Sequence, residues 1–191
     1  MVASAISLIL LALLLGLRRN LGTALFGATM NGQLLVMGVL AVAAAVAALR
    51  LSVPGADRIG ARVGAIATLA LWPVAVLGLH FAYGGTASRL AAEPRHLACT
   101  GNLALMAIVP AVVLFQMIRR GAPLRPGWAV WMASVSAAGV GAMGVALTCP
   151  IDRLPHILFA HALPAIGIAI LLWAVALQAT ARRTRLTNQA V

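Results

Sequence analysis

The chain is dominated by long runs of apolar residues, which short polar segments interrupt at fairly regular intervals. Each run is close to the roughly 20 residues that an α-helix needs to cross a bilayer. The runs are rich in Ala, Leu and Gly and lack the alternation of strands, which favours helices over a transmembrane barrel. The sequence therefore predicts an all-α, polytopic transmembrane helix bundle with six spans, over residues 1–17, 32–49, 63–83, 97–118, 127–148 and 155–180.

The segments between these runs carry the residues that are typical of interfacial loops. Pro54-Gly55 and Gly84-Gly85 mark two of them, and none is long enough to hold a soluble domain. The sequence contains no convincing internal repeat and no low-complexity tract. We therefore expect one transmembrane domain over residues 1–181 and a short tail over residues 182–191.

Composition supports a membrane protein and argues against a soluble domain. Apolar residues make up 63% of the 191, charged residues 9%, and the mean hydropathy is +1.04. A soluble domain is about half apolar and a quarter charged. The net charge of +11 indicates contact with anionic membrane lipid. Direct binding of nucleic acid is not expected, because no basic helix or set of stacking aromatics supports it.

The basic residues, all of them arginine, set the expected orientation. With six spans, one side of the membrane receives the second and fourth loops and the tail, and most of the 14 arginines lie there. The positive-inside rule places this side, and with it both termini, in the cytoplasm. The arginines on this side are Arg50, Arg58, Arg62, Arg119, Arg120, Arg125, Arg182, Arg183 and Arg185.

The first run fits this orientation least well. It is short, no positive charge precedes it, and Arg18-Arg19 fall on the side expected to be outside. A cleaved signal peptide fits no better, since a basic start and a small-residue cleavage site are both missing. We expect that Met1 lies inside a longer natural helix.

The only two cysteines fall at the same expected outer edge of the membrane. Cys99 lies at the start of the fourth run and Cys149 at the end of the fifth. Bridging them would close a loop of about 50 residues, worth roughly 4 kcal/mol in the chain-entropy model. Three interpretations stay open: a structural role, a thiol sensor of an oxidant or a soft metal ion, and a catalytic dithiol. The last is disfavoured, because the chain has no C-x-x-C motif and no second cysteine pair to relay electrons.

All four histidines lie on or near the same expected side. His161 falls about two turns inside the last run, where an ionisable side chain usually faces the bundle interior. His156 and His161 are five residues apart, so a regular helix does not place them on one face as it places residues four apart. A metal site that uses Cys99, Cys149, His156 and His161 therefore requires the helices to converge.

Two further features concern packing. The fifth run carries small residues at intervals of three or four, which lets neighbouring backbones approach closely. This pattern predicts that the run is buried at the centre of the bundle. Pro73, Pro110 and Pro164 fall inside three runs, where each frees a backbone carbonyl and bends the helix. The small residues are Ser134, Ala137, Ala138, Gly141 and Gly144.

Several short motifs together resemble a known family. They are Ala98-Cys99, the run R-R-G-A-P-L-R-P over residues 119–126, Cys149-Pro150, Phe159-x-His161, and R-L-S-V-P-G over residues 50–55. Over roughly residues 5–180 the chain is similar to the NrsF family of six-helix membrane anti-sigma factors, negative regulators of sigma F. Each motif alone is weak, but the basic run and the paired cysteines are fairly specific together.

This resemblance implies a multi-pass protein of the bacterial inner membrane that holds an extracytoplasmic-function sigma factor inactive. It implies no enzymatic activity and no cofactor beyond a transient heavy-metal ion. The two outer cysteines of the family, implicated in sensing heavy metals or oxidative stress, correspond to Cys99 and Cys149. Family members carry a cytoplasmic segment before the first span, and this chain starts within that span, which agrees with the expected truncation.

The hypothesis that follows is a periplasmic, thiol-directed signal that moves the fourth and fifth spans and releases the sigma factor. The alternative is a small transporter or metal-uptake protein, for which His80 and His161 are the only intramembrane candidates and no inverted repeat is visible. Cytoplasmic arginines offer positive charge that steers an acidic partner surface. The candidates for this contact are Arg50, Arg58, Arg62, Arg119, Arg120 and Arg125.

Overall fold

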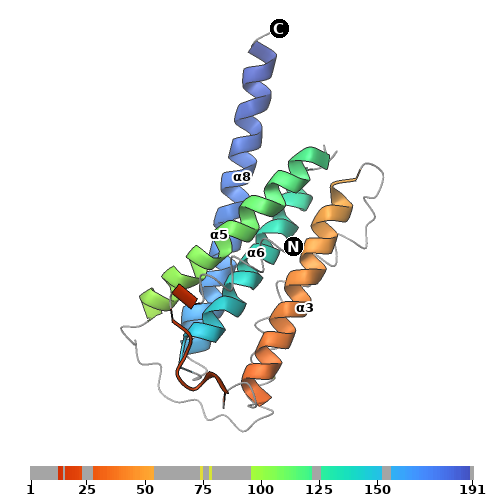
Figure 1. Ribbon diagram of the computed structural model, residues 1–191. Helices are drawn as coiled ribbons and strands as arrows, with labels where there is room; N and C mark the ends of the chain where they lie inside the picture. The colour runs from red at the N-terminus through yellow and green to blue at the C-terminus, as the bar shows by residue number, and fades with distance from the viewer. Residues whose placement is uncertain are drawn as a thin grey trace.

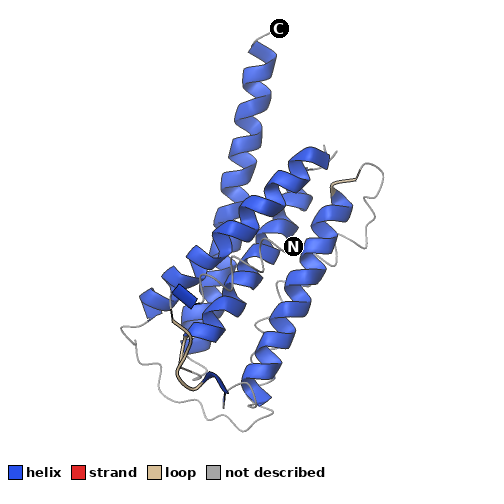
Figure 2. Cartoon of the chain, viewed as in Figure 1, coloured by secondary structure: helices blue, strands red, loops and turns tan. Residues whose placement is uncertain are grey.

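Long helices make up almost all of the part of the chain that the computed structural model describes (Figures 1 and 2). The description covers residues 13–14, 16–22, 28–53, 74, 78, 96–121, 126–151 and 156–189, and no strand occurs in these ranges. The predicted all-α class is confirmed there.

Four predicted spans correspond to observed helices, and their ends agree within about four residues except at the last one, where the helix continues to Gln189, nine residues beyond the predicted end at residue 180. The helices are α3 (Ala28–Leu51), α5 (His96–Gly121), α6 (Pro126–Thr148) and α8 (Leu163–Gln189), the last preceded directly by the π-helix η1 (Ile157–Ala162). Four stretches are long and apolar enough to cross a membrane: Met30–Leu51, Leu97–Gly121, Pro126–Thr148 and Ile157–Thr180.

The described residues therefore hold four candidate spans, not the six that the sequence predicts. The predicted spans over residues 1–17 and 63–83 fall almost wholly outside the described ranges. Only a few of their positions, such as the short stretch at residues 16–17 and the single residues 74 and 78, are described.

Helix α6 is the central helix of the bundle, as its small residues predict. About two thirds of its membrane window (67%) is buried, against 33–39% for the other three. All five residues of the small seam are buried. The Ser136 hydroxyl donates a hydrogen bond to the Ala41 carbonyl of α3 over 2.8 Å. Small side chains thus let α3 and α5 approach the α6 backbone. Large apolar residues of α3, α5 and α8 stay exposed on the outer faces of the described bundle.

The ends of the described helices fall into two groups. At one end Gly121, the last residue of α5, lies against Ser52, which follows α3. At the other end the backbone N–H of Arg18 donates to the Leu147 carbonyl near the end of α6, and the Arg18 guanidinium contacts Met30 near the start of α3. The segments around residues 50 and 120 therefore share one end of the bundle, and the starts of α3 and α5 and the end of α6 share the other.

Candidate thiol–imidazole site

Four chemically active side chains converge at one end of the bundle, although three separate segments supply them. Cys99 comes from the first turn of α5, Cys149 directly follows α6, His156 directly precedes the π-helix η1, and His161 lies in the last turn of η1. One ligand atom from each residue lies within 4.8 Å of the ligand atoms of the other three. We call these four residues the thiol–imidazole cluster.

The contacts inside this cluster are short. The sulfur atoms of Cys99 and Cys149 are 3.3 Å apart and are not joined by a disulfide. The Cys149 sulfur lies 3.1 Å from Nε2 of His156. The rings of His156 and His161 meet edge to face, with their centroids 5.2 Å apart. The contacts therefore form a chain from Cys99 to Cys149, from Cys149 to His156, and from His156 to His161.

The cluster is shielded from solvent, and its environment favours the thiolate of Cys149. All four side chains are buried. The pKa of the Cys149 thiol is lowered, chiefly because Cys99 donates a hydrogen bond to its sulfur; burial acts in the opposite direction, and the His161 ring adds to the lowering. A thiolate is both the nucleophile in disulfide chemistry and the form that binds metal ions.

His161 stands out within the cluster, because its polar atoms are not satisfied. The side chain is 2% exposed, and neither ring nitrogen has a hydrogen-bond partner of ordinary geometry among the described residues. A buried polar group without such a partner costs free energy and calls for an explanation. A lone pair aimed at a bound cation would supply one.

The expectation that His156 and His161 do not share a helix face is wrong. It assumes an α-helix, in which residues five apart point about 140° away from each other. The segment between them is a π-helix, where hydrogen bonds run from each residue to the fifth one before it. The wider turn brings residues five apart onto one face, and no composition signal in this stretch announces it.

The donor set fits one class of metal ion. Two thiolates and two imidazoles are the ligands of tetrahedral zinc sites, in which neighbouring ligand atoms lie about 3.3–3.8 Å apart. The distances of 3.3 Å between the sulfurs and 3.1 Å between Cys149 and His156 are close to this range. The cluster therefore needs shifts of only about 1 Å to surround such an ion.

The candidate partner-binding arginines lie away from this cluster, where they are described. Arg50, Arg119 and Arg120 are exposed at the opposite ends of α3 and α5. The other three candidates, Arg58, Arg62 and Arg125, lie outside the described residues, as does His80. The structure thus brings the predicted sensing and metal residues together, and about 30 Å along α5 separates Cys99 from Arg119 and Arg120. Arg18, which is not among these candidates, lies at the cluster end, where its backbone N–H donates to the Leu147 carbonyl.

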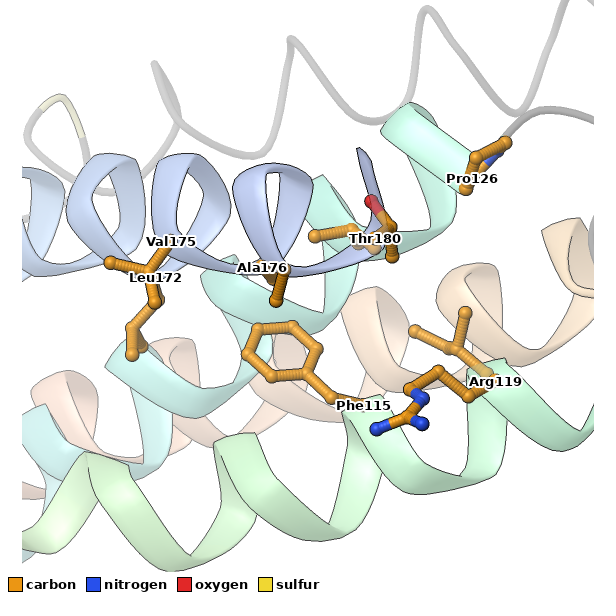
Figure 3. Close-up of a pocket in the computed structure, with 10 residues that line it drawn as sticks. Phe115, Arg119, Pro126, Leu172, Val175, Ala176 and Thr180 are labelled. Atoms are coloured by element: carbon orange, nitrogen blue, oxygen red, sulfur yellow. The ribbon is translucent and has the colours of Figure 1, made fainter. Parts of the chain in front are cut away.

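A cavity of about 370 Å³ lies between α5, α6 and α8 near this arginine end. In Figure 3 the Phe115 ring of α5 points towards Ala176 of α8, and the Arg119 side chain lies beside it. Val130 of α6 also lines the cavity. Sequence reasoning missed this feature, since a cavity depends on how three helices meet and leaves no pattern in any one of them.

The described residues thus form an all-helical bundle with four helices long and apolar enough to cross a membrane. A buried cluster of two thiols and two imidazoles lies at one end, and Arg50, Arg119 and Arg120 are exposed at the other. Comparison with protein families matches residues 1–182 to NrsF, negative regulator of sigma F. This match covers nearly the whole chain, so the protein belongs to the NrsF family. No curated protein and no solved structure matches it.

Proposed function

We propose that this protein is an inner-membrane anti-sigma factor that sequesters an extracytoplasmic-function sigma factor and releases it on a periplasmic, thiol-directed signal. Membership of the NrsF family supports a sigma factor as the partner. The observation that carries the rest is the convergence of four side chains at the end opposite Arg50, Arg119 and Arg120, namely Cys99, Cys149, His156 and His161.

Two signals suit this cluster. A two-electron oxidant of thiols, such as an azo compound or a disulfide, accepts two electrons and two protons from Cys99 and Cys149, and one sulfur–sulfur bond forms. A soft or borderline metal ion instead takes the two thiolates, with His156 and His161 as further ligands. Both signals draw on the same sulfur atoms, so an oxidised pair no longer offers thiolates to the ion.

The two signal-receiving helices offer a route to the far end of the bundle. Cys99 begins α5 and Arg119 ends it, while Cys149 directly follows α6, which begins at Pro126. A change in the spacing of the two sulfurs therefore acts on both helices that flank residues 122–125. Coupling between two sites of this kind is typically about 1–3 kcal/mol, and a signal releases the partner only if it binds the non-holding state better by such an amount.

The proposed orientation places the cluster in the periplasm and the arginine end in the cytoplasm. Most of the arginines follow α3, lie at or after the end of α5, or belong to the tail. The positive-inside rule places such arginine-rich segments in the cytoplasm. There they contact anionic lipid and, we propose, an acidic surface of the sigma factor. Six spans, with both termini inside, complete this topology.

A binding experiment tests the proposal directly. The sigma factor is co-expressed with the protein, and the pair is purified from membranes in detergent. We expect the sigma factor to co-purify under reducing conditions and to dissociate on addition of diamide or Cd²⁺. The double variant Cys99→Ser/Cys149→Ser should still hold the sigma factor and lose both responses.

Ser134→Ala serves as the matched control, because it alters a buried small polar residue of α6 whose hydroxyl bonds only within its own helix. It should behave as the parent chain. If diamide or Cd²⁺ releases the sigma factor from the Cys99→Ser/Cys149→Ser variant as fully as from the parent chain, the thiol-directed signal is overturned. Failure to recover any sigma factor would overturn the anti-sigma role and favour transport, although the described spans carry their ionisable side chains near their ends and not along a path.

A further inference from the structure

The π-helix η1 is the least regular part of the described bundle, and it lies inside the cluster. The backbone N–H of Leu163 donates to the Leu158 carbonyl, five residues earlier, where an α-helix would use the carbonyl four residues earlier. π-helical turns are rare and occur mostly at functional sites. The π-helix η1 follows directly after His156 and contains His161. Its position in the cluster calls for a local cause.

Pro164 supplies one cause. Proline has no backbone N–H, and in a regular helix its ring clashes with the carbonyl four residues before it, here that of Ala160. A wider turn moves this carbonyl away from the ring. The carbonyl also needs another donor, and the Thr100 hydroxyl of α5 donates to it over 3.4 Å. Pro164 and Thr100 therefore both favour the wide turn, and Thr100 ties it to the helix that carries Cys99.

The wide turn decides where the His161 ring lies. In a continuous α-helix His161 would point about 140° away from His156 and leave the cluster. In the π-helix its ring meets His156 at 5.2 Å, buried, with both ring nitrogens lacking a hydrogen-bond partner among the described residues. The π-helical turn thus places the His161 ring next to the two thiols, and Pro164 and Thr100 both favour this turn.

We propose that Pro164 and Thr100 are positioning residues that make the cluster a closed, four-ligand site for a tetrahedral cation of the Zn²⁺ class. This inference rests on the metal-binding half of the proposed function and extends it. Without the wide turn, three ligands remain and a fourth position is open to water. With it, Cys99, Cys149, His156 and His161 fill all four positions, as in structural zinc sites and unlike catalytic ones. The site then holds an ion tightly without leaving room for a substrate.

The test uses Co²⁺ as a spectroscopic probe on the reduced full-length chain in detergent, with Zn²⁺ competition to obtain the affinity. Tetrahedral Co²⁺ bound by thiolates gives intense visible bands, so the readout is independent of any sigma factor. We expect one equivalent to bind the parent chain with these bands. His161→Ala should lose the tetrahedral spectrum, while Pro164→Ala and the milder Thr100→Val should each weaken Zn²⁺ binding by about 10- to 100-fold, as the loss of outer partners of metal ligands does.

A deletion provides the sharpest test. Removing Phe159, whose side chain is exposed, places the two histidines four residues apart, so that a regular α-helix puts them on one face. In the Pro164→Ala background this deletion should restore the affinity that Pro164→Ala loses. Pro110→Ala is the matched control, since Pro110 also lies inside a spanning helix, α5, but further along it than the cluster. It should leave Co²⁺ binding unchanged.

The outcomes separate the two proposals. Absence of tetrahedral Co²⁺ bands in the parent chain would overturn the ligand set while leaving sigma-factor binding to be judged by co-purification. Normal bands and affinity in both Pro164→Ala and Thr100→Val would overturn the positioning role and leave the ligand set standing. A folded deletion variant that fails to rescue Pro164→Ala would also overturn the positioning role.

Discussion

Gly141 of α6 lies in direct contact with the α5 backbone at Leu103: a Cβ atom at position 141 would come within 2.6 Å of the Leu103 carbonyl oxygen. Leu103 is one turn beyond Cys99, and Gly141 is two turns before Cys149. This close approach therefore sets the spacing of the two helices just behind the thiols. It explains in part why sulfur atoms 50 residues apart in sequence come within 3.3 Å of each other.

Gly141→Ala should accordingly disturb both the bundle and the cluster. The added methyl group has only backbone and Ala107 to push against, and overpacking of this kind typically costs about 1–3 kcal/mol. We expect a lower thermal unfolding temperature in detergent and a lower yield of the Cys99–Cys149 disulfide under limiting oxidant. Gly101→Ala is the control on α5, because a Cβ there meets nothing within 4 Å. Equal effects of the two substitutions would contradict this account of helix spacing.

The thiol pair should form an intramolecular disulfide readily, and a bound ion should protect it. In the membrane-embedded chain, diamide is expected to remove both cysteines from reaction with a maleimide reagent without producing a dimer. Prior addition of Zn²⁺ should slow this loss, because the same two sulfur atoms would then be ligands. The measurement is a gel shift after denaturation and maleimide labelling. Loss of the thiols only through dimers would show that the two sulfurs of one chain do not meet.

Sequence reasoning located the four described spanning helices and the residues of the thiol–imidazole cluster better than it described their contacts. The ends of α3, α5 and α6 follow from apolar run length and from the loop residues beside them, and the small residues of α6 predicted its central place. The meeting of His156 and His161 could not be predicted, because it depends on a π-helix that arises from Pro164 and a hydrogen bond from Thr100 on another helix. The apolar pattern of a segment predicts a helix, but it does not predict which turn of that helix becomes π-helical through a contact with another helix.

Ser136 should contribute more to the bundle than the neighbouring Ser134. The Ser136 hydroxyl donates across to the Ala41 carbonyl of α3, while that of Ser134 donates to the Val130 carbonyl of its own helix. Hydrogen bonds between transmembrane helices contribute about 0.6 kcal/mol on average and up to about 1.7. Ser136→Ala should therefore lower the thermal unfolding temperature in detergent more than Ser134→Ala does. A larger loss from Ser134→Ala would mean that the contact between α3 and α6 rests on shape alone.

The cavity at the arginine end offers a way to test whether the helices must move for release of the partner. Phe115 and Arg119 of α5 and Ala176 of α8 line it, so the two helices leave unfilled space between them there. Ala176→Leu adds apolar volume to this space, and burying additional methyl groups where room exists is stabilising by about 0.8 kcal/mol for each carbon group.

We therefore expect Ala176→Leu to raise the thermal unfolding temperature and to reduce release of the sigma factor by oxidant or Cd²⁺, while the Cys99–Cys149 disulfide still forms. Ala174→Leu makes the same substitution at a half-buried position of the same helix, outside the set of residues that line the cavity, and serves as the control. Both disulfide formation and partner release are measured on the same sample. Full release from a stabilised Ala176→Leu variant would exclude this cavity from the path between the thiols and the partner, because the movement would then proceed with the space filled.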